Sequence, residues 1–193
     1  MRTIFLVSPA RCSGDRAKVL ITSKTSKLGG RLREGTATLG EVFTWLSALY
    51  FRGKLEYARQ FGMPLIMGQG LGLRAPEHRL DVPAFRAMGR VSIESRTFLR
   101  ALRRDAEMVA TEDARVVLLG SIATTKYIAP LIEILGERLL FPATFVGRGD
   151  MSRGGLLLRA TRSGEELAYV PVLGAVRHGV RPPKLPRMIS AQV

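Results

Sequence analysis

The stretch VVLLGSIATTKYIAPLIEILGERLLFPATFVGRGDMSRGGLLLR, from Val116 to Arg159, decides the fold of this chain. It opens with four apolar residues that end at Gly120 and Ser121. Apolar residues then recur at spacings of one, three and four up to Leu135, which predicts a helix, and Gly136 ends the pattern. Leu139 begins a second extended run. Strand, polar turn, helix and strand form an αβ repeat, in which polar groups follow the carboxyl ends of buried strands.

Pro130 sits inside the helical pattern and is tolerated only near a first turn, so the regular helix is predicted to begin close to residues 126–129. Ser121, Thr124 and Thr125 then lie in or beside the turn that leads into the helix, and Lys126 follows them. Free backbone amides and the helix dipole make such a turn suitable for phosphate or carboxylate. Simple capping of the helix accounts for the same residues equally well.

The loop that follows the second strand of this unit, residues 147–155, carries the densest polar chemistry. Arg148 and Arg153 have the fork geometry that binds phosphate or carboxylate oxygens. Asp150, between them, could act as a base, position a water molecule, or pair with the arginines.

The start of the chain predicts a further strand, Thr3–Val7, which ends in a turn holding Arg11, Cys12, Ser13 and Asp15. Cys12 is either a nucleophile or a small buried side chain. A strand at Leu65–Met67 runs into glycine-rich residues 68–72, whose spacing does not fit a dinucleotide fingerprint. Gln69 in this turn is placed to hydrogen-bond a base edge or an amide.

A long helix is predicted after Thr38, which forms a capping box with Glu41. Its apolar stripe runs from Leu39 to Phe61, and charged residues including Arg52 and Lys54 are predicted to lie mainly off that stripe. Residues 16–38 are basic and glycine-containing, which predicts a poorly ordered excursion. It either contacts a phosphate backbone or is a solvated loop.

The C-terminal part predicts a β-hairpin at the edge of the sheet, made of the β-rich runs 155–162 and 165–172. From Val176 onward the chain is basic and contains three prolines, so it predicts a tail that is wrapped on the surface or free to follow a polyanion. We therefore expect one α/β domain, residues 1–176, and a basic proline-rich tail, residues 177–193.

Composition points to an anionic partner. Lys and Arg number 30 against 16 acids, which gives a net charge of +14 and a pI near 11.1. Such a field favours polyanions, namely nucleic acid, anionic lipid or phosphorylated small molecules such as nucleotides, although an arginine-rich soluble protein would show it as well. No apolar run is long enough to span a membrane, and the short N-terminal apolar run favours a cytoplasmic protein. One cysteine and two histidines provide no zinc-ligand set, and no cofactor is expected.

Several short motifs carry a family resemblance across residues 3–160. They are Pro9 with Cys12-Ser13; residues 49–54 (LYFRGK) with Tyr57-Ala58; residues 70–73 (GLGL); Gly120-Ser121 with Lys126-Tyr127 and Pro130-Leu131; and Phe141-Pro142. In this order they resemble an uncharacterised bacterial α/β family related to the uracil-DNA-glycosylase-like fold and to a domain of archaeosine-type tRNA-modifying enzymes. The Gly-Gln-Asp-Pro and His-Pro-Ser stretches of true uracil-DNA glycosylases are absent, and Gln69 between two glycines is a partial match.

These observations together predict a three-layer αβα sandwich with a mostly parallel sheet of about four strands, a C-terminal β-hairpin and a basic tail. The resemblance implies a nucleic-acid- or nucleotide-associated protein of glycosylase-like fold that acts on a nucleobase N-glycosidic bond. In that reading Asp150 or Asp15 orients water, the arginines and the 121–125 turn hold phosphate, and Gln69 reads the base. The alternatives are a non-catalytic basic module that binds DNA or RNA, and a subunit of a larger complex.

Overall fold

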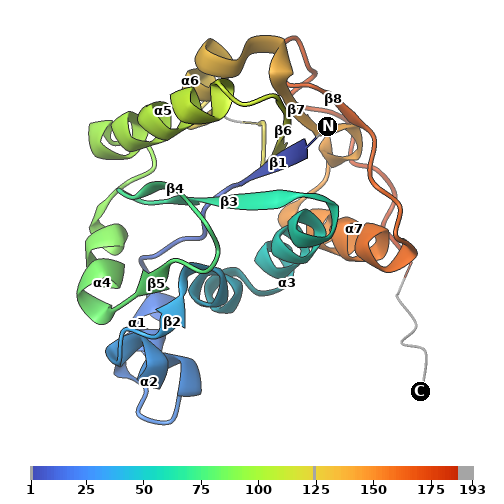
Figure 1. Cartoon of the computed structure of the whole chain (residues 1–193). Coiled ribbons are helices and arrows are strands. Elements are labelled where there is room, and N and C mark those ends of the chain that lie inside the picture. The colour runs from blue at the N-terminus through green and yellow to red at the C-terminus, as the bar shows by residue number, and fades with distance from the viewer. Residues whose placement is uncertain (1, 124, 187–193) are drawn as a thin grey trace.

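The chain folds around a six-stranded mixed sheet, seen in a computed structural model that describes residues 2–123 and 125–186 (Figure 1). The strand order is β4-β3-β1-β6-β7-β8. The four inner strands run parallel, and the two edge strands, β4 and β8, run antiparallel to their neighbours. Their bounds are β1 Arg2–Val7, β3 Met63–Gly68, β4 Gly72–Arg74, β6 Ala114–Leu119, β7 Leu139–Pro142 and β8 Tyr169–Pro171.

The central strands are continuous apolar runs because both faces of the sheet are covered. β1 lies between β3 and β6, with Leu6 opposite Leu65 on one side and Leu118 on the other. Residues 4–7 and 116–119 are completely buried. Parallel strands buried on both faces are apolar throughout instead of alternating, which is the pattern seen in the sequence.

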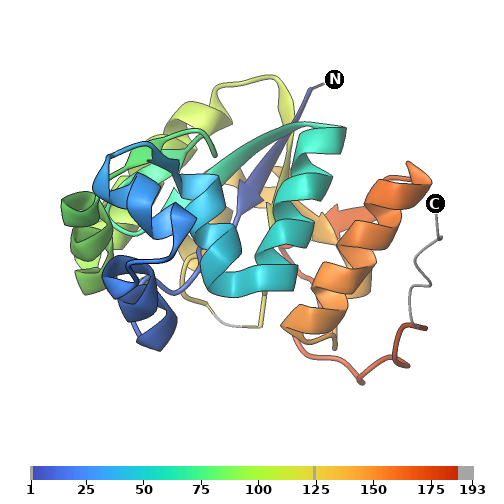
Figure 2. The same cartoon turned by 90° about the horizontal axis from the view of Figure 1, so that it is seen from below.

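Helices cover both faces of the sheet and make three layers. α3 and α7 pack against each other on one face, whereas α5 and α6 pack together on the opposite face (Figures 1 and 2). A small antiparallel ribbon of β2 and β5 lies with α1, α2 and α4 at one side of the sheet. The bounds are α1 Asp15–Thr22, α2 Lys27–Arg33, β2 Ala37–Thr38, α3 Leu39–Phe61, β5 Arg79–Leu80, α4 Val82–Arg90, α5 Arg96–Ala110, α6 Ile128–Leu135 and α7 Asp150–Ser163.

The predicted number of strands and the predicted C-terminal hairpin are wrong. The sheet has six strands instead of about four, because a short antiparallel strand is added at each edge of the four predicted strands, which run parallel as expected. The predicted C-terminal hairpin is mainly helix α7, and only β8 remains of it. Arg153, Leu157 and Ala160 are buried at helical spacing, and leucine favours helix when it can bury one face, so the leucine-rich run forms a helix.

Residues 16–38 are ordered, contrary to the prediction of a loose excursion. They form α1, α2 and the short strand β2. The hydroxyl of Ser26 caps α2 by accepting a hydrogen bond from the Gly29 amide at 3.0 Å. Gly29 also packs directly on the backbone of Leu20, where a Cβ would lie 2.6 Å from the carbonyl oxygen. The glycine pair that suggested disorder therefore serves close packing of the two helices.

Helix α3 begins as predicted but contains a break. Thr38 and Glu41 form the full capping box at its start. At Ala48 the backbone turns to φ 43° and ψ −122°, a conformation that costs an alanine roughly 1–2 kcal/mol. The break separates two helical segments, and the second segment carries Tyr50 and Lys54.

The first part of the basic tail is wrapped on the surface. Residues 177–186 follow β8 and run past α7, where Arg148 donates to the Pro183 carbonyl at 3.3 Å and Arg159 donates to that of Pro186. Residues 187–193 of the predicted tail lie outside the described residues. Within the described part of the chain, no helix has both the length and the apolar character needed to cross a membrane.

Candidate functional site

The sheet has one topological switch point, and it lies between β1 and β6. From β1 the chain crosses to β3 on one side, whereas β6 and β7 are added on the other. The loops that leave these two strands therefore diverge at their carboxyl ends, where open α/β sheets bind ligands. Here the Ser8 amide donates to the Leu119 carbonyl at 3.1 Å, and Gly120 lies against Ser8.

Two glycines bring helices α3 and α7 into direct backbone contact beside this point. A Cβ on Gly53 would lie 2.7 Å from the Gly154 carbonyl oxygen, and a Cβ on Gly154 would lie 2.8 Å from the Tyr50 Cα. Both contacts are with backbone atoms that side-chain rotation cannot move. The crossing therefore requires glycine at both positions. At this crossing, residues 50 and 54 of α3 lie opposite residues 150 and 153 of α7.

A polar group lies buried around this crossing, and we call it the helix-crossing cluster. Lys54 is its centre, with a side chain that is only 1% exposed. Its Nζ donates to the carbonyl oxygen of Ser8 at 2.8 Å and to the Ser8 Oγ at 2.9 Å. It also lies 4.4 Å from the ring centroid of Tyr50. The cluster consists of Ser8, Tyr50, Lys54, Tyr127 and Arg153, with Asp150 at its edge.

Burial lowers the pKa of Lys54 to about 7 from its usual 10.5, because a charged ammonium loses its hydration there. The nearby Asp150 carboxylate opposes this effect, and the Arg153 guanidinium adds to it. Lys54 can therefore gain or lose a proton near neutral pH, which an exposed lysine does not do.

The hydroxyl groups of the cluster differ in their hydrogen bonding. The Tyr127 hydroxyl donates to the Ser121 carbonyl at 3.2 Å and faces Ser8 across Gly120. The Tyr50 hydroxyl is buried and makes no hydrogen bond of normal geometry with any described residue. Burial raises the pKa of both phenols, so each keeps its proton and remains a donor.

Arg153 is the second buried cation of the cluster, with 8% of its surface exposed. Its Nε donates to the Phe145 carbonyl at 3.3 Å, and its guanidinium lies over the Phe145 ring. One guanidinium nitrogen is 3.5 Å from the Asp150 carboxylate, whose side chain is 68% exposed. Two buried cations are thus balanced by one acid that is largely in solvent.

A second feature, the loop cleft, opens after β1 and β3 and has a volume of about 480 Å³. It gathers four of the predicted residues, Arg11, Cys12, Ser13 and Gln69, together with Arg90 of α4. Gln69 is held by its own chain: its Nε2 donates to the Ala10 carbonyl at 2.7 Å, and its Oε1 accepts from the Cys12 thiol at 3.3 Å. Gln69 thus ties two loops together, so both ends of the predicted base-reading amide are engaged.

Cys12 has the surroundings of a buried filler and not of a nucleophile. Burial raises the pKa of its thiol to about 12, and the hydrogen bond to Gln69 only partly opposes this. The reactive species of cysteine is the thiolate, which is almost absent near neutral pH at such a pKa.

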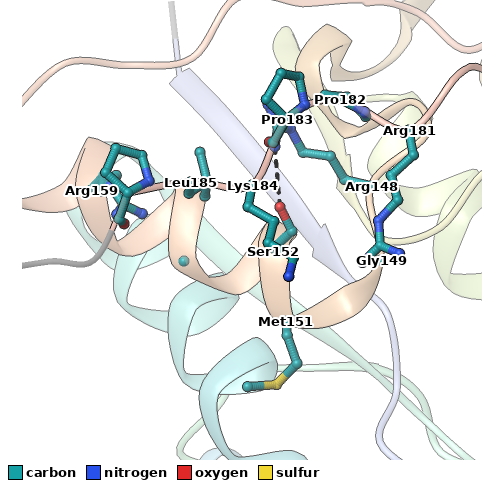
Figure 3. Close-up of a pocket in the computed structure, with 12 residues that line it drawn as sticks. Arg148, Gly149, Met151, Ser152, Arg159, Arg181, Pro182, Pro183, Lys184 and Leu185 are labelled. Atoms are coloured by element: carbon teal, nitrogen blue, oxygen red, sulfur yellow. Dashed lines mark hydrogen bonds between the residues drawn. The ribbon is translucent and has the colours of Figure 1, made fainter.

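A third feature, the basic groove, lies between α7 and the tail and has a volume of about 410 Å³ (Figure 3). Arg148, Arg159, Arg181 and Lys184 line it, and no acid among the described residues does. Arg148 is fixed by the Thr144 carbonyl at 3.1 Å and the Ser152 hydroxyl at 3.1 Å. Arg181 and Lys184 are exposed to solvent, and neither makes a hydrogen bond or ion pair within residues 2–123 and 125–186.

Of the remaining predicted site residues, one borders the helix-crossing cluster and the others lie apart from the three features. Ser121 borders the helix-crossing cluster through its carbonyl. Thr125 and Lys126 are exposed, and Lys126 pairs with Glu94 at 3.2 Å. The side chain of Asp15 is 99% exposed and has Lys18 as its ion-pair partner, so nothing in the structure pairs it with Asp150. Thr124, in the same predicted turn as Thr125, lies outside the described residues.

The sequence-based prediction missed the centre of the cluster. Lys54 was placed mainly off the apolar stripe of its helix, yet it lies on the buried face with Tyr50 and Phe51. A signal was available within the second helical segment, because Tyr50 and Lys54 are four residues apart and therefore lie on the same face of that segment. Tyr127 was counted as an apolar position of the next predicted helix, so the sequence pattern gave no indication that its hydroxyl belongs to the site.

Within the described residues, no group of three histidine, cysteine, aspartate or glutamate side chains is arranged to hold a metal ion. No protein-family model matches the chain, and comparisons with curated proteins and with solved structures found no significant match. The site must therefore be interpreted from its own residues.

Proposed function

We propose that the protein binds the phosphodiester backbone of nucleic acid, with the basic groove as the contact surface. The observation that carries the proposal is the set of four cations in this groove, Arg148, Arg159, Arg181 and Lys184, with no acid among the described residues that line it. Two of them, Arg181 and Lys184, face solvent. The net charge of +14 supports it, since a positive field draws polyanions to the surface.

Salt dependence tests the proposal. Each phosphate contact on a single strand contributes about −0.7 to the slope of log affinity against log salt, so four contacts give a slope of about −3. The assay is fluorescence anisotropy of a labelled single-stranded oligonucleotide, repeated as DNA and RNA across a salt series. The double variant Arg181→Gln/Lys184→Gln should weaken binding to every sequence alike and reduce the slope by about 1.4.

The matched control removes the same charge elsewhere. Arg96→Gln/Arg100→Gln on the exposed side of α5 has the same net charge as the groove variant. If both double variants lose affinity equally, only net charge matters and the groove is not the binding surface. Binding that does not depend on salt would remove the nucleic-acid proposal altogether.

A catalytic form of this function is favoured by the position of Asp150. Its carboxylate is exposed at the edge of the helix-crossing cluster, and its charge acts on Lys54, Tyr50 and Tyr127. In this form Asp150 accepts a proton from water as the water oxygen bonds to C1′ of a nucleoside, and the base leaves with the bonding electron pair. The glycosylase-like resemblance supports this reaction class. A base in a duplex would first have to be unpaired.

Release of free base from single-stranded oligonucleotides, measured by chromatography, tests this reaction. Asp150→Asn keeps the size of the side chain and removes the proton acceptor, so it should abolish release while binding to the oligonucleotide is retained. If both Asp150→Asn and Asp15→Asn release base at the wild-type rate, neither acid serves the reaction and the hydrolytic form is wrong.

A further inference from the structure

We propose that the helix-crossing cluster is a binding site for a single phosphate group, supplied as inorganic phosphate or as the monoester of a nucleotide. The proposal rests on three independent properties of the cluster: its charge, its unpaired hydroxyl and its place in the fold. None of its residues lines the basic groove, so this inference can succeed or fail separately from oligonucleotide binding.

The cluster contains two buried cations and, among the described residues, no buried anion to balance them. Lys54 and Arg153 are both almost fully buried and repel each other when both are charged. Asp150, the only carboxylate near them among the described residues, is mostly in solvent and 3.5 Å from Arg153. Buried charges are normally paired or hydrogen-bonded within the protein, so an anion between these two cations would supply the missing partner.

The hydroxyl groups add neutral donors around the same point. Tyr50 is 6% exposed, and its hydroxyl makes no hydrogen bond of normal geometry within the described residues. The Arg153 guanidinium lies within reach of the phenol oxygen but can only donate, so the phenol proton has no acceptor among the described residues. The hydroxyl lies close enough to Arg153, Tyr127 and Asp150 to interact with each of them. A buried donor without an acceptor destabilises the folded protein, and it therefore indicates that an acceptor is missing from the site. Phosphate has enough acceptor oxygens for the two cations and the Tyr50 phenol, whereas a carboxylate has only two.

The place in the fold is the one where phosphate is commonly held. The cluster lies at the switch point of the sheet and beside the start of α7, a helix of 14 residues. Gly149 precedes this helix without a capping side chain, so the first amides of the helix have no side-chain acceptor there. Gly120 has no side chain, which leaves the hydroxyls of Ser8 and Tyr127 facing one another.

In this arrangement the Asp150 carboxylate competes with phosphate for Arg153. In the free protein its carboxylate is the nearest anion to Arg153. A bound phosphate would take over that interaction and would also be repelled by the displaced carboxylate. Removing the charge of Asp150 should therefore strengthen phosphate binding, although the same change abolishes the proposed base release.

Isothermal titration calorimetry of the full chain with inorganic phosphate tests the site, with a nucleoside monophosphate and the corresponding nucleoside as further arms. Phosphate and the monophosphate should bind, and the nucleoside should not. Tyr50→Phe should weaken phosphate binding about tenfold, and Asp150→Asn should strengthen it about fivefold. Because Tyr50→Phe removes only a hydroxyl that makes no hydrogen bond of normal geometry within the described residues, its folding should be preserved.

Proton uptake distinguishes this site from a surface contact. The polar and charged groups near the Lys54 amine are Ser8, Tyr50, Asp150 and Arg153. The Lys54 amine changes its protonation near neutral pH, and phosphate binding should hold it protonated. At about pH 8 binding should take up close to one proton, measured from heats in buffers of different ionisation enthalpy. Absence of phosphate binding, or equal binding by wild type and Tyr50→Phe, would overturn the proposal.

Discussion

Lys54→Met should remove a rise of stability with pH that the buried Lys54 gives the wild-type protein. Methionine has a similar length, no charge and a strong preference for buried surroundings. The variant removes the buried ammonium and its two hydrogen bonds to Ser8. Because the unfolded chain exposes Lys54 to water, the difference between wild type and variant reports the cost of burying this one amine.

The magnitude follows from the pKa of Lys54, which is about 7 in the folded chain against 10.5 for an ordinary lysine. Below about pH 7 both states hold the proton, and burial of the charge costs the fold about 5 kcal/mol. Between about pH 7 and 10.5 the unfolded chain holds more protons than the folded one. The free energy of unfolding therefore rises with pH by about 1.4 kcal/mol per pH unit in this window.

Urea unfolding of both proteins at about pH 7, 8 and 9 measures this effect. The wild-type curve should rise with pH relative to that of Lys54→Met, since other titrating groups cancel in the difference. Loss of the bonds to Ser8 offsets part of the gain, so the variant should be about 2 kcal/mol more stable near pH 7. Lys18→Met, at an exposed lysine of α1, should show no such difference in slope.

Parallel curves for wild type and Lys54→Met would refute this reasoning, because they would mean that Lys54 keeps an ordinary pKa in the folded chain. A variant that is less stable than wild type at every pH would show that the hydrogen bonds to Ser8 outweigh the cost of the buried charge.

Two substitutions and one labelling reaction test the contact between α3 and α7, the break in α3 and the burial of Cys12. Gly154→Ala should destabilise the fold by about 3 kcal/mol in chemical denaturation, because its Cβ would lie 2.8 Å from the Tyr50 Cα; Gly149→Ala, which meets no atom within 4 Å, is the control. Ala48→Gly should stabilise the fold by up to about 1 kcal/mol, since φ is 43° at this position, and an unchanged or lower melting temperature would contradict the break in α3. Cys12 should react with iodoacetamide only slowly in the folded protein at about pH 8, since its pKa is about 12, and rapidly after unfolding in urea; fast labelling of the folded chain would show an accessible thiolate.

The sequence alone predicted the inner sheet well. Residues 4–7 and 116–119 are apolar at every position, which indicates strands covered on both faces. Thr38 and Glu41 marked the start of α3 through a local hydrogen-bond pattern. These features are local, since they depend on residues within a few positions of one another.

Predictions failed where distant contacts decide the local structure. The leucine-rich run after Gly154 has the composition of a strand or a helix, and burial against α3 selects the helix. The glycines at 29 and 30 contributed to the prediction of a poorly ordered segment, yet Gly29 allows α2 to approach Leu20. In each case the deciding neighbour lies on another element.

The stretch from Val116 to Arg159 by itself determined an αβ unit with polar residues after its strands, because periodicity and turn residues act over short distances. Tertiary structure alone decided which of those polar residues meet. Arg153 and Asp150 of this stretch face Lys54, about 100 residues away in sequence, because Gly53 and Gly154 let two helices touch. The pKa of that lysine depends on desolvation by surrounding elements, which no local pattern specifies.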